Sequence, residues 1–216
     1  MKPVVAFQPA LPSEIDRLVA EFPLALVISA SADGRPQATP LPLVLQRSVD
    51  GQDLLIGHFS RKNPQLELIR QQPRALIAFS GAQGYIATSW FKDRRYAPTW
   101  NYEAVHFTVD IELDDRPEAA SAALEVLIAH AEAPYPKPWR SQEMGPRFAQ
   151  LAQYIVPFRA RILGTAAQFK LGQGDPAEVL VDTYAGLARY GQHELAAAMR
   201  RNEYLQSLKA DAAVFA

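Results

Sequence analysis

The chain has 216 residues, 49% of them hydrophobic and 21% charged, which is typical of a folded protein and excludes a disordered one. It contains no cysteine, which excludes disulfides, thiolate catalysis and cysteine-ligated metals and fits a reducing compartment. The formal net charge of −1 gives no basic excess for nucleic-acid binding. Without a membrane-length apolar run or a secretion signal, we expect a cytoplasmic protein with no membrane contact.

The N-terminal part of the chain predicts one helix followed by a β-hairpin. Ser13 can cap a helix over residues 13–21. The apolar run 24–30 that follows is predicted as a strand buried on both faces. Asp33-Gly34 is a strong hairpin-turn signal, and the return strand is predicted over residues 37–46. Two prolines within that return strand indicate a sheet edge or a bulge.

The next segment combines a strand end, a hydroxyl, two cations and a helix start. A strand is predicted over residues 54–59, and Asn63-Pro64 begins a helix as N-cap and first helical residue. Ser60-Arg61-Lys62 lies between these two elements. A hydroxyl and two cations beside free backbone N–H groups predict a phosphate-binding site. The alternative is that both cations are solvated surface charges.

The middle of the chain predicts three further strands. Two of them cover residues 75–80 and 85–90, with Gly81 and Gly84 framing a turn between them. The third is an unusually long strand over residues 99–113, since strands average about 5–6 residues. Its apolar side chains exceed what one small barrel needs, and such a surplus indicates an interface.

The last part of the chain is predicted to be mostly helical. Asp115 and Glu118 cap a helix that reaches His130, and a short helix follows around Phe148. The remaining predicted elements are a strand over residues 155–163 and two helices that start after Asp175 and separate at Tyr190-Gly191. Six or seven strands with few long helices between them favour an antiparallel α+β barrel over a doubly wound parallel sheet.

Five segments carry a family resemblance, in this order: residues 38–43 (ATPLPL), 57–65 (GHFSRKNPQ), 85–90 (YIATSW), 98–106 (PTWNYEAVH) and 170–173 (KLGQ). They resemble the PaiB-like family of FMN-binding negative transcriptional regulators, which are FMN split-barrel flavoproteins of the pyridoxamine-phosphate-oxidase type. The resemblance implies a mainly β, α+β split β-barrel with peripheral helices over residues 1–165. It also implies a C-terminal helical extension over residues 166–216, FMN as cofactor, and a homodimer.

The resemblance further implies a set of cofactor-binding residues. Thr39 and Leu41 would lie beside the isoalloxazine ring, and Ser60 to Asn63 would hold the phosphate. The tryptophans and Asn101 would line the flavin pocket from the partner subunit, although core packing is the alternative for the tryptophans. The full set is Thr39, Leu41, His58, Ser60, Arg61, Lys62, Asn63, Trp90, Trp100, Asn101, Lys170 and Gln173. Phe169, Gly172 and Gly174 depart from the family's usual tryptophan, serine and asparagine. These departures weaken the case that Lys170 and Gln173 bind the cofactor.

Other chemistries find less support in the sequence. His58 and His106 lie on separate predicted strands and would form a metal pair only if those strands bring them together. His193-Glu194 begins a zincin-like string, but Ala197 stands where the second histidine belongs. No catalytic residue is predicted, because in flavoproteins the cofactor does the chemistry.

Three functions therefore compete. The first is an FMN-dependent oxidoreductase that acts on a small-molecule substrate or on NAD(P)H. The second is a flavin-sensing transcriptional regulator without its own DNA-recognition helix and without direct nucleic-acid contact. The third is a barrel that has lost its flavin and serves as an interaction module, against which the intact Ser60-Arg61-Lys62 counts.

Overall fold

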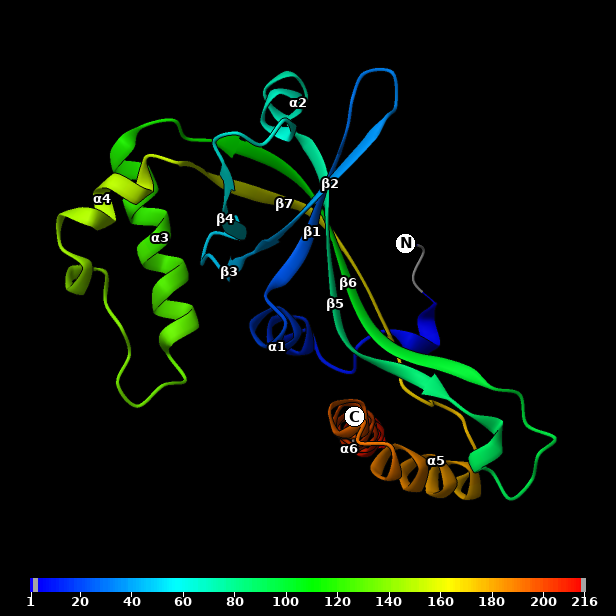
Figure 1. The fold of residues 1–216 in the computed structure, drawn as a ribbon. Coiled ribbons are helices and arrows are strands. Elements are labelled where there is room, and N and C mark those ends of the chain that lie inside the picture. The colour runs from blue at the N-terminus through cyan, green and yellow to red at the C-terminus, as the bar shows by residue number, and fades with distance from the viewer. Residues whose placement is uncertain (2–3, 215–216) are drawn as a thin grey trace. The chain divides into compact units, whose positions relative to one another are not determined.

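The structure is a computed structural model that describes the chain apart from residues 2–3 and 215–216. Its described residues form one seven-stranded sheet with the strand order β2-β1-β5-β6-β7-β4-β3 (Figure 1). The neighbouring strands are antiparallel, as the registers β1–β2, β1–β5, β3–β4 and β4–β7 show. The strands are β1 (Leu24–Ala30), β2 (Pro36–Pro42), β3 (Val44–Gln46), β4 (Leu54–Ser60), β5 (Arg74–Ile86), β6 (Thr99–Leu113) and β7 (Ile155–Lys170).

Six α-helices and three short 3-10 helices accompany these strands in the described part of the chain. The α-helices are α1 (Ser13–Glu21), α2 (Gln65–Gln71), α3 (Pro117–Glu132), α4 (Pro146–Ala152), α5 (Ala177–Arg189) and α6 (His193–Val214). The 3-10 helices are Val5–Phe7, Thr88–Trp90 and Ser141–Met144. Among the residues described, no helix is both long and apolar enough to span a membrane.

The chain divides into two compact units, and the three longest strands contribute to both. The first unit contains Met1–Leu18, Ser80–Val105 and Ala166–Ala216. The second unit contains Val19–Phe79 and His106–Thr165. The division into residues 1–165 and 166–216 stays a prediction.

Strand β1 shows why the second unit has a one-sided sheet. Its bounds match the prediction, but the expectation of burial on both faces is wrong. Ala25 and Val27 are buried, whereas Leu24 and Leu26 are 65% and 45% exposed. Because side chains alternate between the faces of a strand, β1 contributes one face to the core and leaves the other apolar face open.

The predicted return strand over residues 37–46 is divided into two strands at opposite edges of the sheet. Strand β2 lies at one edge and β3 at the other. Leu43, which separates them, is fully buried, and its N–H donates to the carbonyl of Pro23 at 2.9 Å. The prolines of β2 do stand on an edge strand, as predicted, where a missing N–H leaves no sheet hydrogen bond unmade.

The predicted turn at Gly81 and Gly84 is wrong, because β5 continues through both residues. A Cβ atom on Gly81 would lie 2.9 Å from Glu103 Oε2 and 3.0 Å from Leu18. A Cβ atom on Gly84 would collide with Gln192. Both glycines therefore permit close packing inside the first unit, and neither one reverses the chain.

Two helix starts differ from the prediction. Helix α2 begins at Gln65, and Asn63 stands one residue before the N-cap position, where its Oδ1 accepts the Gln65 N–H at 2.9 Å. Helix α3 begins at Pro117, and Asp115 does not cap it. The Asp115 carboxylate instead accepts hydrogen bonds from two arginine side chains of the second unit.

Candidate functional site

A cleft of about 470 Å³ lies in the second unit beside the start of α2, and it is called the α2 cleft below. Segments about 20 residues apart in sequence meet there, since β2 forms one side and the end of β4 with the following loop forms the other. The lining residues are Gln37, Ala38, Thr39, Ser60, Lys62, Asn63 and Pro64. Four residues from the predicted set thus line one open cleft, whose volume is in the range of small-ligand sites.

A buried hydrogen-bond network holds the wall of the α2 cleft. Gln65 is 1% exposed, and its Nε2 donates to the carbonyl of Val27 at 2.9 Å and to Ser29 Oγ at 2.7 Å. The Thr39 hydroxyl donates to Gln65 Oε1 at 2.6 Å and accepts from Asn63 Nδ2 at 2.9 Å. Because each polar atom has a partner, the network fixes Thr39 and Asn63 in place.

Sequence reasoning assigned no role to Gln65 or Ser29. Gln65 belongs to the segment 57–65 that carries the family resemblance, and this was the available signal. A glutamine in the first turn of a helix is ordinarily read as a solvated surface residue. Only its contact with β1 shows that it connects that strand to α2.

The two predicted phosphate-binding cations lie in different surroundings. Lys62 lines the α2 cleft with an exposed side chain, and its ammonium group makes no hydrogen bond or ion pair with any described residue. Arg61 does not line the cleft. Its guanidinium donates to the carbonyls of Gln153 and Ile155 at 2.9 and 3.0 Å and to Asp115 Oδ1 at 3.3 Å. Arg61 therefore anchors the loop that carries Lys62.

Leu41 and His58 lie near the cleft residues in sequence but do not line it. Leu41 is a buried residue of β2, two positions after Thr39 and on the same strand face. His58 is half-buried on β4 and stands opposite Pro157 of β7. Its Nδ1 is buried without a partner among the described atoms, and burial lowers the pKa of this imidazole.

His58 and His106 do not lie on neighbouring strands. They belong to β4 and β6, and β7 lies between these two strands. Strands are spaced about 4.8 Å apart, which puts the two backbones roughly 9.6 Å from each other. The described residues contain no group of three His, Cys, Asp or Glu side chains that could hold a metal ion.

The predicted tryptophans and Asn101 lie in the first unit. Trp90 stacks on Tyr190 with ring centroids 5.6 Å apart and covers Gly186 of α5, which favours the core-packing alternative. Trp100 is 49% exposed, and its Nε1 donates to Gln83 at 2.9 Å. Asn101 is 1% exposed, and its Oδ1 has no partner among the residues described.

Lys170 and Gln173 make local contacts in the first unit. The Lys170 ammonium donates to the Thr99 hydroxyl. Gln173 Nε2 donates to the carbonyl of Phe169 at 2.6 Å, and its Oε1 accepts the Leu171 N–H at 2.7 Å. Gly172 lies in the left-handed region with φ of +84°. The Gln173 side chain thus stabilises the turn over residues 169–173 through hydrogen bonds to its backbone.

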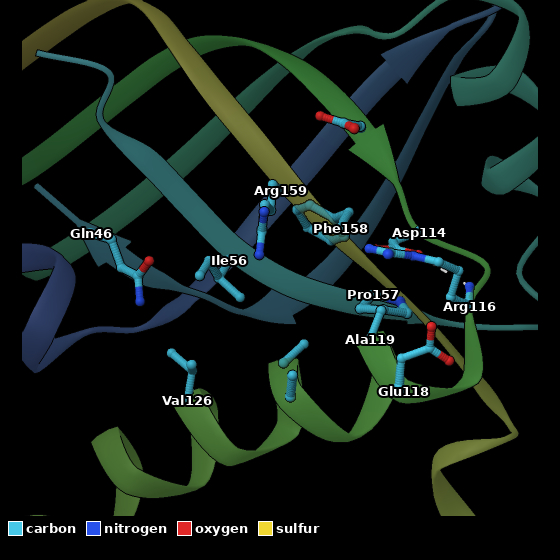
Figure 2. A pocket seen from close by; sticks show the side chains of 13 residues that line it. Gln46, Ile56, Asp114, Arg116, Glu118, Ala119, Val126, Pro157, Phe158 and Arg159 are labelled. Carbon is cyan, nitrogen blue, oxygen red and sulfur yellow. Dashed lines mark hydrogen bonds and ion pairs between the residues drawn. The ribbon is translucent and has the colours of Figure 1, made fainter. Parts of the chain in front are cut away.

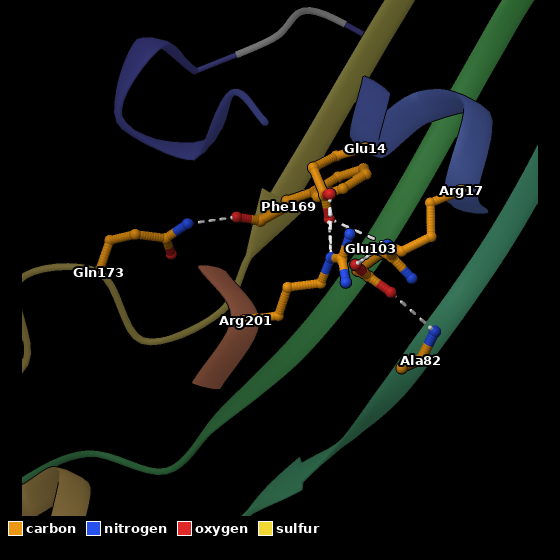
Figure 3. Close-up of polar contacts among 7 residues, drawn as sticks. All are labelled: Glu14, Arg17, Ala82, Glu103, Phe169, Gln173 and Arg201. Carbon is orange, nitrogen blue, oxygen red and sulfur yellow. Dashed lines mark hydrogen bonds and ion pairs between the residues drawn. The ribbon is translucent and has the colours of Figure 1, made fainter. Parts of the chain in front are cut away.

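A buried ionic network in the first unit was not predicted (Figure 3). Arg17 donates to Glu14 at 2.9 Å and also to Glu103, whose Oε2 accepts the Ala82 N–H at 3.3 Å. Arg201 of α6 donates to both oxygens of Glu14, at 2.9 and 2.8 Å. Glu14 and Glu103 are 4% and 1% exposed. The network ties α1, β5, β6 and α6 together.

Burial acts differently on the two carboxylates of this network. Burial raises the pKa of Glu103, and the charge and hydrogen bond of Arg17 oppose the shift without cancelling it. Burial also opposes ionisation of Glu14, but hydrogen bonds from Arg201 and Arg17 outweigh it and lower the pKa of Glu14. The network shares no residue with the lining of the α2 cleft.

Comparison with known proteins decides the family. Residues 1–163 match the family described as "Putative FMN-binding domain". The chain belongs to this FMN-binding family. It is 30% identical over 161 residues to the "Protease synthase and sporulation protein PAI 2" of Bacillus subtilis (strain 168), covering 74% of this chain and 76% of that protein. FMN is therefore its cofactor, as predicted.

Solved structures confirm the predicted α+β split-barrel fold. The conserved hypothetical protein Rv2991 from Mycobacterium tuberculosis is similar with a TM-score of 0.59 and 18% identity, over 82% of this chain and 94% of that one. The flavocytochrome Anf3 from Azotobacter vinelandii has a TM-score of 0.59 and 17% identity, over 80% of this chain and 73% of that one. At this identity the likeness concerns the fold.

Proposed function

We propose that FMN binds with its phosphate in the α2 cleft. The cleft is lined by hydrogen-bond donors and by no carboxylate, which is the chemistry a dianionic phosphate requires. Lys62 offers an ammonium group without a competing partner in the described residues, and the Ser60 hydroxyl donates to none of them. Arg61 contributes indirectly by anchoring this loop. The residues of the cleft therefore fit the cofactor.

The working unit that we propose is a two-fold homodimer. The open face of β2, β1 and β5 carries two rows of uncharged side chains that run across the three strands. One row contains Pro40, Leu26 and Ala78, and the next contains Ala38, Ile28 and Leu76. Ala38 also lines the α2 cleft, so this apolar face borders the cofactor site. A second copy seated on it would bury the exposed leucines and close the cleft against water.

The activity that this site supports best is flavin-dependent oxidation and reduction, with a small molecule or NAD(P)H as the electron donor. Bound FMN supplies the hydride- or electron-transfer chemistry. Lys62 and Ser60 hold the phosphate, and the Gln65 network orients Thr39. The apolar face of a second copy excludes water from the ring. The absence of cysteine supports placing this chemistry in a reducing cytoplasm.

A regulatory role is the second candidate, and one observation favours it. The Bacillus relative at 30% identity is named for protease synthesis and sporulation. The net charge of −1 leads us to propose that such regulation would proceed without direct contact between this chain and DNA. In that case FMN would sense redox state or a metabolite.

Titration of the purified protein with FMN and with riboflavin tests the site. Replacing the Lys62 ammonium in K62A should weaken FMN binding by about 1.5–3 kcal/mol and leave riboflavin binding unchanged, because riboflavin has no phosphate. Lys137→Ala, at another exposed lysine outside the cleft, is the matched control. Equal FMN affinity of K62A and wild type would refute the assignment. Bleaching of the flavin spectrum by NAD(P)H would favour the enzyme over the sensor.

A further inference from the structure

A second cavity of about 530 Å³ lies in the second unit between helix α3 and the sheet (Figure 2). It shares no lining residue with the α2 cleft. Its apolar walls are formed by Ile56, Pro157 and Phe158 from the sheet and by Ala119, Ala122 and Ala123 from the helix. The volume is in the range of small-molecule sites. It is called the α3 cavity below.

The composition of α3 explains why the space stays open. Among the described side chains of this helix, only Ala120 is buried. Four of the helix residues that line the cavity are small, the three alanines and Val126, and short side chains of this kind leave space between the helix and the sheet. Protein interiors are normally packed as densely as organic crystals, so a gap of this size is not filled by the chain itself.

One cation reaches into the cavity without a partner. Arg159 stands opposite Ile56 across the β4–β7 ladder. Figure 2 shows its guanidinium extending between Ile56 and Phe158 toward α3. In the part of the chain that the structure describes, Arg159 makes no hydrogen bond or ion pair, and Asp114 is the acidic group on which its charge acts.

The acidic residues that line the cavity interact with a different arginine, Arg116. Arg116 donates to Asp114 Oδ1 at 2.9 Å and to Oδ2 at 2.6 Å, and the charges of Glu118 and Glu112 also act on Arg116. These hydrogen bonds lower the pKa of Asp114 to about 2, so its carboxylate is ionised at neutral pH. Figure 2 places this group at one end of the cavity and Gln46 at the other, with Arg159 between them.

We propose that the α3 cavity binds a small carboxylic acid with an apolar, aromatic or branched aliphatic body. A guanidinium matches the planar geometry of a carboxylate through two parallel hydrogen bonds. The Gln46 amide offers a further donor at the end of the cavity away from Arg116. The apolar body lies between the alanines of α3 and the Ile56–Phe158 floor. The proposal needs no FMN and stands apart from the proposed cofactor site.

A displacement assay with matched ligands tests the head-group preference. The probe is 1-anilinonaphthalene-8-sulfonate, an aromatic anion whose fluorescence rises when it leaves water. We expect saturable binding that phenylacetate reverses. Phenylacetamide and phenethylamine have the same aromatic ring without the negative charge. We expect both to displace the probe at least about tenfold more weakly than phenylacetate, because each lacks one charge-assisted contact.

Two variants with matched controls locate the site. Ala122→Phe fills the cavity and should abolish probe binding, whereas Ala129→Phe, on the same helix outside the cavity, should not. Arg159→Gln should weaken displacement by phenylacetate about tenfold. Arg161→Gln, on the same strand but paired with Asp110 at 3.0 Å, should leave displacement unchanged.

Four results would overturn the proposal. They are the absence of saturable probe binding to the wild type, equal probe binding by Ala122→Phe and wild type, equal displacement of the probe by phenethylamine and phenylacetate, and equal displacement by phenylacetate from Arg159→Gln and from wild type. Unfolding curves of each variant show whether it folds. Because Arg159 is exposed and makes no hydrogen bond in the described structure, its glutamine variant keeps the test valid even if the phenylalanine variant fails to fold.

Discussion

At the scale of single residues, the Arg17 guanidinium bridges the two carboxylates of the buried ionic network. It joins Glu14 and Glu103 inside the first unit, and Glu103 is 1% exposed. A buried ion pair contributes little net stability over an apolar pair of the same shape. Losing one partner is nevertheless costly, because the other charge remains buried.

Arg17→Met should therefore destabilise the fold strongly. We expect a loss of about 3–5 kcal/mol in the free energy of unfolding, measured by urea denaturation at neutral pH. Arg35→Met is the control, since Arg35 pairs with Asp33 in an ion pair whose side chains are 84% and 57% exposed. That variant should keep the wild-type midpoint. A similar midpoint for both variants would contradict the role given to Arg17.

The two carboxylates of the network should show opposite pH dependences. A raised folded-state pKa means that folded Glu103 holds its proton to higher pH, so its contribution to stability falls as pH rises from its unfolded pKa to its folded pKa. The lowered pKa of Glu14 makes its contribution complete above its unfolded pKa, and it is lost as pH falls through the folded pKa.

This difference is measured by the free energy of unfolding of wild type, E103Q and E14Q between about pH 3 and pH 8, in steps of about one pH unit. The stability of wild type relative to E103Q should decrease with rising pH above the unfolded glutamate pKa of about 4.3. The stability of wild type relative to E14Q should increase with rising pH below that value. Parallel curves for the two variants would contradict the opposite shifts.

At the scale of elements, the loop before α2 is held by a residue of the segment between β6 and α3. The Asp115 carboxylate accepts from Arg61 at 3.3 Å and from Arg70 at 3.0 Å. All three side chains are about half exposed, so the ion pairs add little to stability. Their effect is to hold the loop that carries Lys62.

Asp115→Asn should therefore reduce FMN affinity more than it reduces stability. We expect a several-fold weaker FMN titration, on the order of 1 kcal/mol, with an almost unchanged unfolding midpoint. Asp110→Asn is the matched control, because Asp110 also joins two arginines, Arg74 and Arg161, away from the cleft. If both variants bind FMN like wild type, Asp115 does not position the loop.

Helix α5 depends on a glycine for its packing. A Cβ atom on Gly186 would collide with the indole of Trp90. Alanine gains about 1 kcal/mol over glycine in a helix, whereas overpacking costs about 1–3 kcal/mol. Gly186→Ala should therefore lower the thermal midpoint. Gly164→Ala, where a Cβ atom has nothing within 4 Å, should not. A higher midpoint for Gly186→Ala would show that Trp90 moves freely.

At the scale of the whole molecule, the apolar face of β2, β1 and β5 leads to the proposed dimer. Light scattering should give about twice the 23.9 kDa chain mass. Leu26→Asp places a charge in the middle of this face and should produce a monomer with weaker FMN binding. Val49→Asp, at a fully exposed loop position, is the control and should remain dimeric. A wild-type monomer that retains FMN would refute the shared interface.

Local chemistry determined much of the element order in this protein. The capping and hairpin signals around Ser13 and Gly34 are read within a few residues, and α1 and β1 have the predicted bounds. The segment from Ser60 to Asn63 was predicted as a phosphate site from its residue types, and three of its four residues line the α2 cleft. Cations and hydrogen-bond donors favour a phosphate in any fold, so such a prediction rests on residue type alone.

Only the tertiary structure decided what distant segments do to one another. Arg61 meets Asp115 and the carbonyls of Gln153 and Ile155, and these partners lie more than 50 residues away in sequence. The glycines of β5 look like turn residues until the packed neighbours of Gly81 are seen. Partners of this kind leave no local pattern, because a contact between remote segments depends on the register and packing of the whole sheet.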